Sequence, residues 1–372
     1  MKKYKKMIHY VNNTQDELIQ LIKDLCFIPS FSYREKEKAL FIHNWFKQYK
    51  IDTIIDKQNN VILPIDCKDE LTIFCAHIDT VFPDETGFTC KEKDGRLYAP
   101  GVGDDTANVA LLMLIARYLV LNKINIHNTL IVFNSCEEGL GNLEGIRYIM
   151  NTYKNIKEFY SFDLTYEQII CKAVGSSRYK ITIFTEGGHS YSAFGNQNAI
   201  ALCSNLIHKL YQYQVPKRGT STYNVGIIEG GTSVNTIAQK ASFLFEYRSD
   251  HHEDLKEMIE FFNQTVNTYQ DNGIHIQVEV IGERPSHGDV NQDKLNKIVD
   301  NASNIIEMYT NKKPLLSSGS TDCNIPYSLG IPGCCFGGYI GRNEHTREEW
   351  IDLSSLKTGM KILMHFIINC IN

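Results

Sequence analysis

Two adjacent glutamates, Glu137 and Glu138, stand in the stretch NSCEEGLG, directly after the apolar run TLIVF. Their carboxylates repel each other, and a bare pair of charges beside a buried strand is costly. A solvated turn is one explanation of the pair. The other is a site that uses the two carboxylates in different roles, and such a site requires further metal-binding or charged side chains nearby.

Metal-binding side chains also follow other apolar runs of the chain. FCAHIDT supplies His77 and Asp79, whose spacing places both on one face of a strand. Asp104 in GVGDDTAN precedes an apolar helix, Asp163 stands in SFDLT, and His345 stands in the glycine-rich segment GGYIGRNEHT. A capped loop, a helix N-cap or a surface residue also explains each feature alone. Because ligands in open α/β sheets bind at the carboxyl ends of strands, the features together favour one shared site.

The donor types in this set indicate the chemistry. Imidazole and carboxylate groups without thiolates suit zinc and similar divalent ions. Two such ions about 3.5–4 Å apart, bridged by a carboxylate and a water, form a hydrolytic device. A nearby carboxylate that binds no metal would accept the proton of the water, and an Asp two residues after a ligating His would orient the imidazole. The donor set, if it converges, would therefore suit a two-metal hydrolytic site.

The elements that would position this site alternate between strands and helices. Helical spacing covers residues 16–27, 34–49 and 106–121, and strand patterns cover residues 71–79, 129–138 and 158–163. Such alternation is typical of an α/β fold with a doubly wound, mostly parallel sheet. The tail returns to this style, with a helix at 292–309, a strand in GIPGCCFGG and a last helix in DLSSLKTGMKILMHFIIN.

A different pattern separates these two parts of the chain. Residues 178–285 predict the order β-α-β-β-α-β, the ferredoxin-like arrangement of a compact α+β domain. We therefore expect a catalytic domain of residues 1–177 and 286–372, interrupted by an inserted domain of residues 178–285 that serves as lid and dimerisation domain.

Composition excludes several classes of protein. The 372 residues carry a net charge of -5, which does not suit nucleic acid or an anionic membrane as a partner. The longest apolar segment, residues 109–120, contains Arg117 and is too short to span a bilayer. The basic N-terminus lacks the apolar stretch of a signal peptide. Eleven cysteines without a CxxC pair suit a reducing compartment, so we expect a cytoplasmic protein.

The ordered set of motifs resembles the di-zinc metallopeptidase family that includes peptidase T, carboxypeptidase G, the aminoacylases, and the acetylornithine and succinyl-diaminopimelate deacylases. HxD, GxGDD, EEG, a strand-end Asp, GGHS, GGTSxN, ExRS, GSTD and a late His occur in family order over nearly the whole chain. The stretches AVGSSRY, GGHSYSAFG, NVGIIEGGTSVNTIA and GSTDCNIPYSLGIP are most similar to the tripeptidase-like, peptidase-T-related branch.

The resemblance implies five ligands for two zinc ions, which cobalt or manganese could replace. His77 and Asp163 would bind one ion, Glu138 and His345 would bind the other, and Asp104 would bridge the two. It also implies a cis peptide bond after the bridging Asp104. The chain has Thr-Ala after its paired aspartates where many relatives have Lys-Gly or Lys-Ala, but this change leaves every implied ligand in place.

The resemblance further implies roles in catalysis and substrate binding. Glu137 would be the general base, and Asp79 would orient the ligating histidine of its HxD motif. His189 of GGHS would reach a site across a dimer interface and polarise the scissile carbonyl, while Asn235 and Arg248 would hold the carboxylate of the substrate. The residues expected to line the pocket are Ser320, Thr321 and Asp322 of GSTD.

The expected protein is thus a homodimeric two-zinc hydrolase that cleaves amide bonds of small peptides. Aminopeptidase action on dipeptides or tripeptides is the preferred reaction, because of the branch that the chain resembles. An N-acyl-amino-acid deacylase or a carboxypeptidase of the same family is the alternative. A non-catalytic binding protein on this fold is a third reading, which the presence of Glu137 disfavours.

Overall fold

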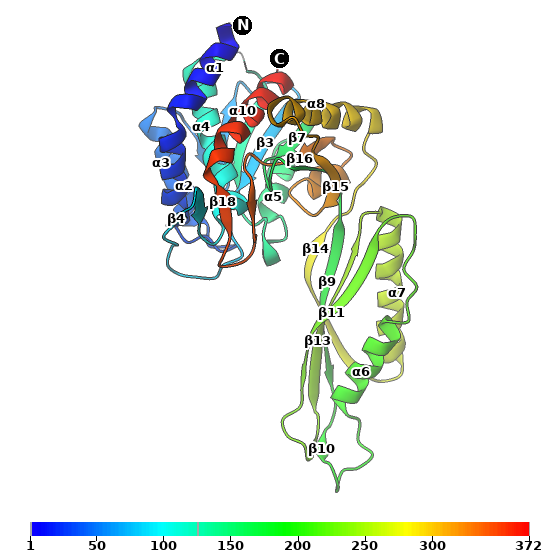
Figure 1. Cartoon of the computed structure of the whole chain (residues 1–372). Coiled ribbons are helices and arrows are strands. Elements are labelled where there is room, and N and C mark those ends of the chain that lie inside the picture. Colours follow the sequence, from blue (N-terminus) through cyan, green and yellow to red (C-terminus); the bar gives the residue numbers. More distant parts are fainter. Residues whose placement is uncertain (1, 125, 372) are drawn as a thin grey trace. The chain divides into compact units, whose positions relative to one another are not determined.

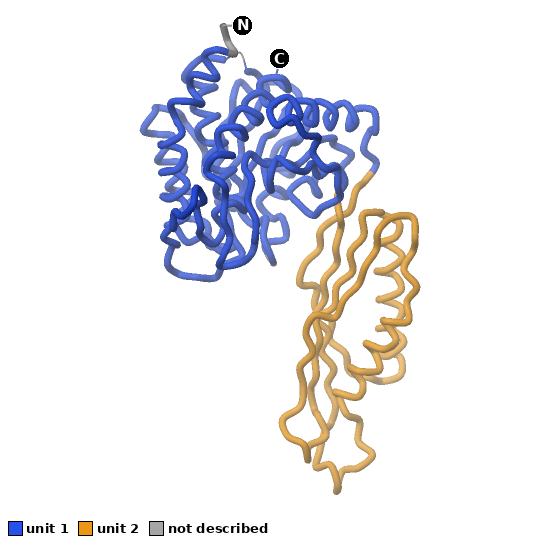
Figure 2. Tube along the Cα trace, viewed as in Figure 1, with its two compact units in different colours: residues 1–172, 289–372 blue, residues 173–288 orange. Residues whose placement is uncertain are grey.

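The computed structural model describes residues 2–124 and 126–371 and divides the chain into two compact units (Figures 1 and 2). The first unit contains residues 1–172 and 289–372, and the second contains residues 173–288. The second unit therefore begins slightly before and ends slightly after residues 178–285. Its first strand starts at Gly175, so a boundary at residue 178 would cut this strand.

Among the described residues, eight strands form the main sheet of the first unit, in the order β1-β2-β6-β3-β7-β16-β8-β15. Strands β6, β3, β7 and β16 pair in parallel, and β2 pairs antiparallel with β6. The predicted α/β fold with a mostly parallel sheet is confirmed. The bounds are Ile54–Ile55 (β1), Val61–Ile65 (β2), Leu71–His77 (β3), Thr129–Asn134 (β6), Ile156–Ser161 (β7), Gln168–Ala173 (β8), Leu315–Gly319 (β15) and Gly333–Cys335 (β16).

Both faces of this sheet are covered, as a doubly wound fold requires. On β3, Phe74 and Ala76 belong to the large apolar core, while Ile73 and Cys75, which point to the opposite face, are also fully buried. The helices of the unit are α1 (Lys2–Asn13), α2 (Gln15–Cys26), α3 (Lys36–Gln48), α4 (Asn108–Leu121), α5 (Glu144–Thr152), α8 (Gln292–Thr310), α9 (Asn324–Ser328) and α10 (Leu353–Cys370).

Helix α4 is the apolar segment that the sequence predicts as a core helix. Its residues are buried from Asn108 to Leu119, which is why it is apolar on all sides rather than amphipathic. A turn of π-helix, Val102–Ala107, leads into it. Within the described part of the chain, none of the helices combines the length and apolar character that a bilayer crossing requires.

A small antiparallel sheet connects two distant segments of the first unit. It has the order β17-β18-β5-β4, with bounds Gly341–Arg342 (β17), Trp350–Asp352 (β18), Arg96–Tyr98 (β5) and Lys91–Lys93 (β4). The pairing of β5 with β18 brings the segment before α4 next to the segment before α10.

The second unit has the ferredoxin-like order of elements. Its sheet is antiparallel, in the order β11-β13-β9-β14, and its core packs Ile181 and Phe243 with side chains of two helices. The elements are β9 (Gly175–Phe184), α6 (Ala199–Leu210), β11 (Ser221–Gly230), β13 (Lys240–Ser249), α7 (His252–Asp271) and β14 (His275–Arg284). Two short strands, β10 (Gly188–His189) and β12 (Thr236–Ile237), pair with each other outside this sheet.

Candidate metal and catalytic site

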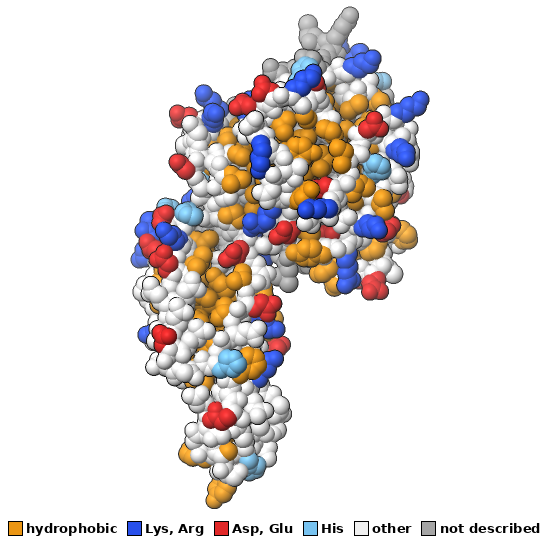
Figure 3. Space-filling model, turned by 180° about the vertical axis from the view of Figure 1, so that it is seen from behind, with side chains coloured by type: hydrophobic (Ala, Val, Ile, Leu, Met, Phe, Trp, Pro, Cys, Tyr) orange, Lys and Arg blue, Asp and Glu red, His pale blue; other side chains and the backbone are white. Residues whose placement is uncertain are grey.

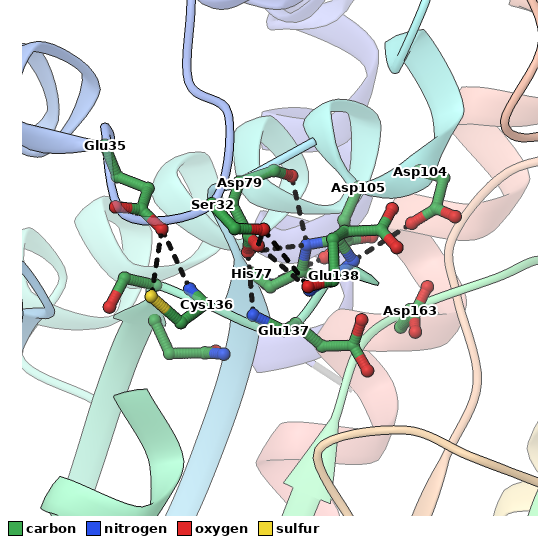
Figure 4. Close-up of polar contacts among 12 residues, drawn as sticks. Ser32, Glu35, His77, Asp79, Asp104, Asp105, Cys136, Glu137, Glu138 and Asp163 are labelled. Atoms are coloured by element: carbon green, nitrogen blue, oxygen red, sulfur yellow. Dashed lines mark hydrogen bonds and ion pairs between the residues drawn. The ribbon is translucent and has the colours of Figure 1, made fainter. Parts of the chain in front are cut away.

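Three parallel strands of the first unit end at the same edge of the sheet. His77, the last residue of β3, lies opposite Asn134, the last residue of β6, and β7 is in register beside β3. The loops that leave these strands carry Asp79, the two glutamates and Asp163 (Figure 4). The strand-end positions read from the sequence therefore do converge.

The predicted metal ligands lie within reach of one another. His77 Nε2 is 3.0 Å from Asp104 Oδ1, and the ligand atoms of His77, Asp104 and Glu138 all lie within 4.8 Å of one another. His345 Nε2 is 3.1 Å from Asp104 Oδ2 and 3.2 Å from Glu138 Oε1. A second group, with the same spacing limit, joins His77 to Asp163. The structure thus brings the five predicted ligands together.

Asp105 also belongs to this second group, although it is not among the predicted site residues. Its Oδ2 accepts a hydrogen bond from His77 N at 3.0 Å, and its Oδ1 accepts one from Asn108 Nδ2 at 2.7 Å. Both oxygens are thereby used to join the end of β3 to the start of α4. The Asp104–Asp105 peptide bond is cis, as the resemblance implies.

The carboxylates and imidazoles of this cluster shift one another's pKa values. Burial and the charge of Asp104 raise the pKa of Glu138 to about 8 and the pKa of Asp163 to about 7. Hydrogen bonds that His345 donates to the Asp104 and Glu138 carboxylates raise the pKa of His345 to about 11. Burial alone would lower the pKa of His77, but its carboxylate neighbours raise it well above the usual value. Glu138 and Asp163 thus hold protons more readily than exposed carboxyl groups do, and bound cations would replace those protons, so the donor set fits divalent ions such as zinc.

Asp79 organises the loop that carries the two glutamates. Its Oδ1 accepts a hydrogen bond from Glu137 N and its Oδ2 accepts one from Glu138 N, both at 2.9 Å. Ser32 Oγ donates to Oδ2 at 2.6 Å. The ring of His77 contacts Asp79 as well, with Nδ1 3.4 Å from Oδ1 and 3.2 Å from the main-chain oxygen. The carboxylate therefore contacts both the imidazole and the main chain of the glutamate pair.

Glu137 is buried beside the cluster, yet it belongs to neither ligand group that the described residues form. Its neighbour Glu138 belongs to the first group. The two adjacent glutamates are thus placed differently, which is what different roles require.

Three of the predicted residues lie in the second unit. His189 on β10 is exposed and opposes Thr236 on β12, and Ser190 N donates a hydrogen bond to Asn235 O at 2.9 Å. Arg248 lies near the C-terminal end of β13, where its Nε donates to Glu246 Oε1 at 3.1 Å. Pairing in the unit therefore joins His189 to the Asn235 segment, while Arg248 occupies a separate position.

The GSTD residues precede the short helix α9. Thr321 is buried; its N–H donates to Asn324 Oδ1 at 2.9 Å and its Oγ1 accepts from Cys323 N at 3.2 Å. Ser320 is half-buried. Asp322 is fully buried, its Oδ2 accepts from Asn134 Nδ2 at 2.8 Å, and burial and the charge of Glu137 raise its pKa well above the usual value.

Ser32, Glu35 and Glu349 are buried polar residues of this region that the sequence prediction does not include. Each contacts the main chain of a loop that carries predicted site residues. The only signal in the sequence is a charged residue near a motif, as in NEHTREEW, and this does not distinguish a buried side chain from a solvated one.

Comparisons with known proteins identify the family of this chain. The model of Peptidase family M20/M25/M40 matches residues 73–369. The chain is 24% identical over 366 residues to a succinyl-diaminopimelate desuccinylase of Corynebacterium glutamicum, covering 94% of this chain and 95% of the relative. Among solved structures, aminopeptidase PepT from Bacillus cereus has a TM-score of 0.74 at 23% identity, and a Staphylococcus aureus tripeptidase has a TM-score of 0.77 at 19% identity. Each alignment covers 95% of this chain and 98% of the solved chain. The resemblance read from the motifs is confirmed: this chain belongs to peptidase family M20/M25/M40 and is a hydrolase of that family.

Proposed function

We propose that this hydrolase holds two zinc ions and cleaves amide bonds of small peptides, as an aminopeptidase-type exopeptidase acting on dipeptides or tripeptides. One observation carries the two-ion part of the proposal. Asp104 directs Oδ1 to His77 Nε2 and Oδ2 to His345 Nε2, at 3.0 and 3.1 Å. A carboxylate shared in this way between two imidazoles is suited to bridging two ions, one on each histidine.

The remaining ligands then divide between the two sides of Asp104. Asp163 groups with His77, and Glu138 contacts His345. Zinc suits this donor set, and cobalt or manganese would be expected to substitute. Ions held here would supply a water of lowered pKa and would polarise the scissile carbonyl.

Glu137 would move the proton in this reaction. Its main-chain N–H is fixed by Asp79 Oδ1, and its side chain is buried next to the ligands without belonging to their groups. Its carboxylate would accept a proton from the attacking water and then donate that proton to the nitrogen of the leaving amine.

The second unit would supply contacts to the substrate. Arg248 carries a planar guanidinium suited to a carboxylate, and its side chain keeps 37% of its surface exposed beside Glu246. Asn235 would assist it, Ser320 and Thr321 of the first unit would lie near the substrate, and His189 would polarise the scissile carbonyl from a second copy of the chain.

A homodimer through the second unit is part of this proposal. β11 is an edge strand of its sheet and exposes Ile227 and Ile228, so the side of this strand that faces away from β13 could pair with another copy. On the face in Figure 3 the described basic side chains are interspersed with acidic ones, which does not favour nucleic acid as a partner. All eleven cysteines are free, which supports a cytoplasmic location.

Deacylation of an N-acyl amino acid is a second candidate function. The observation that favours it is the desuccinylase of Corynebacterium glutamicum, whose sequence aligns with 94% of this chain. The same ligands and the same glutamate would serve both reactions, because each breaks an amide bond. The two candidates differ in the group on the amine side of that bond.

The test is a panel of dipeptides, tripeptides and N-acyl amino acids, incubated with protein loaded with zinc, cobalt or manganese. Mass spectrometry would identify the products, and a parallel series would contain chelator. Release of N-terminal residues supports the aminopeptidase, and release of acyl groups alone supports the deacylase. If no compound of either class is cleaved with any of the three metals, the proposed function is wrong.

A further inference from the structure

Two buried glutamates next to the cluster of predicted metal ligands belong to neither of the ligand groups that the described residues form. Glu35 follows the loop after α2 and is 0% exposed, and Glu349 precedes β18 and is 1% exposed. A buried carboxylate is costly unless several donors satisfy it. Main-chain N–H groups of the loops that carry predicted site residues donate to both carboxylates, and the Cys136 thiol also donates to Glu35, whose Oε2 has no partner among the described residues.

Glu349 holds the loop that carries Asp104. Its Oε1 accepts hydrogen bonds from Gly103 N and Asp104 N at 2.8 Å, and its Oε2 accepts one from Gly101 N at 2.7 Å. Gly101 has a φ of 69°, a conformation that side chains other than glycine rarely adopt. The pairing of β5 with β18 places Glu349 beside this loop, and Ala99 N also donates to Glu349 O at 3.2 Å. The carboxylate thus fixes the main chain at the predicted bridging ligand with both of its oxygens.

Glu35 holds the loop that carries Glu137 (Figure 4). Its Oε1 accepts hydrogen bonds from Tyr33 N at 2.9 Å, Cys136 N at 3.0 Å and Cys136 Sγ at 3.3 Å. Cys136 has a φ of 58°, which is strained for a residue with a side chain, so the conformation needs outside support. Glu137 follows directly, and its own N–H is held by Asp79. The direction in which Glu137 leaves the strand therefore depends on Glu35.

We propose that Glu35 and Glu349 are positioning residues with separate targets: Glu349 sets the metal-bridging Asp104, and Glu35 sets the general base Glu137. This inference rests on the proposed function for the roles of Asp104 and Glu137. Removing either glutamate leaves every ligand side chain in place, so the two losses should appear in different measurements. Glu349 should govern metal affinity, and Glu35 should govern the rate of the chemical step.

The experiment compares E349A and E349Q with E35A and E35Q. Matched controls are E348Q and E37Q, which change exposed glutamates adjacent to Glu349 and two residues after Glu35. Zinc binding to chelator-treated protein is measured by calorimetry, and the absorption spectrum of the cobalt-loaded protein reports the ligand geometry. Values of kcat and KM are measured on the best substrate of the panel, and amide hydrogen exchange is measured at residues 101–104 and 136–138.

E349A should bind zinc about 10- to 100-fold more weakly, show an altered cobalt spectrum, and exchange amides 101–104 faster. E35A should keep the zinc stoichiometry, affinity and cobalt spectrum of the wild type. Its kcat should fall about 10- to 100-fold at unchanged KM, and amides 136–138 should exchange faster. The controls should match the wild type throughout.

The amide variants separate positioning from a general loss of packing. The hydrogen bonds from Tyr33 N, Cys136 N and Cys136 Sγ all go to Oε1 of Glu35, and a glutamine keeps one such oxygen, so E35Q should recover most of the activity that E35A loses. Glu349 uses both oxygens, so E349Q should recover only part of the metal affinity. If circular dichroism shows that an alanine variant is unfolded, the corresponding glutamine variant is compared with the wild type instead.

The inference is overturned if E349A binds zinc like the wild type, if E35A loses zinc in parallel with E349A, or if E35Q is as inactive as E35A. Failure of the proposed function has a different signature. In that case the wild-type protein cleaves no substrate, but zinc affinity and amide exchange still report whether the two glutamates act on separate loops.

Discussion

The two units position their candidate functional residues by different means. In the first unit, His77, Glu137, Glu138 and Asp163 come from strand ends, Asp104 from the turn before α4 and His345 from the loop after β17, and all except His345 are buried. Asp79, Asp105 and Glu349 hold their loops with side-chain to main-chain hydrogen bonds. In the second unit, main-chain pairing places His189 and the Asn235 segment together and leaves His189 exposed. The first arrangement suits chemistry on fixed atoms, and the second suits contacts that form when a substrate arrives.

Metal removal should have the largest effect and should act through the first unit. Chelation should reduce hydrolysis to below about a thousandth of the starting rate, because the ions supply several kcal/mol of transition-state stabilisation. It should also lower the melting temperature, since ligands that bind only the folded state stabilise it. Activity assays and calorimetry with and without chelator check this. Re-addition of zinc is the control. Full activity of protein that contains no metal would contradict the two-metal site.

Glu137→Gln should cause the second-largest loss of activity. The amide cannot accept the proton of the attacking water, so kcat should fall about 10²- to 10⁴-fold. Metal content should be unchanged, because Glu137 belongs to neither ligand group. Metal analysis and kcat are measured on the same preparation. Glu138→Gln is the matched variant at the adjacent residue and should lose metal; equal metal loss from both variants would remove the distinction between them.

Arg248→Ala tests the second unit. Loss of a charged hydrogen bond to a substrate carboxylate should raise KM about 10- to 100-fold, with metal content unchanged. Lys180→Ala, on the exposed side of the neighbouring strand, is the control and should leave KM unchanged. Substrates with an amidated C-terminus lack the carboxylate, so Arg248→Ala should change their KM little. This comparison sharpens the test. A variant that loses metal instead would show that the second unit affects the ligand cluster directly.

The smallest expected effect is a pH dependence of the free energy of unfolding that arises from the ligand cluster of the first unit. In the metal-free protein the folded-state pKa of Glu138 is about 8 and that of Asp163 about 7, both above their unfolded values. The folded state therefore binds more protons between about pH 4 and pH 8, so these groups make the free energy of unfolding fall as pH rises through that window. Denaturant titrations at several pH values measure the slope.

Bound metal should flatten this dependence, because the cations replace the protons on the carboxylates. E138Q removes one of the two groups, so the metal-free variant should show a shallower slope than the metal-free wild type. K180A leaves the ligand cluster intact and should keep the full slope. A slope that is the same with and without metal would contradict the electrostatic account of the cluster.

Strand ends were predictable because their signal is local. An apolar run followed by His77, by the glutamate pair or by Asp163 is visible in the sequence, and parallel strands bring their carboxyl ends to one edge. The same reasoning could not assign Asp105, since a second aspartate before a helix has the same appearance as a ligand. Only its two hydrogen bonds, to His77 N and Asn108 Nδ2, show that it joins β3 to α4.

The sequence by itself determined the α/β class, the inserted unit, the family, and the side chains that gather at the sheet edge, because periodicity, charge and motif order are encoded over short stretches. The tertiary structure decided which buried carboxylates hold loops. Glu35 meets Cys136, and Glu349 meets Asp104, across separations of 101 and 245 residues. The physical reason is that a main-chain N–H can donate to any suitable oxygen, so its partner is set by long-range packing rather than by local pattern.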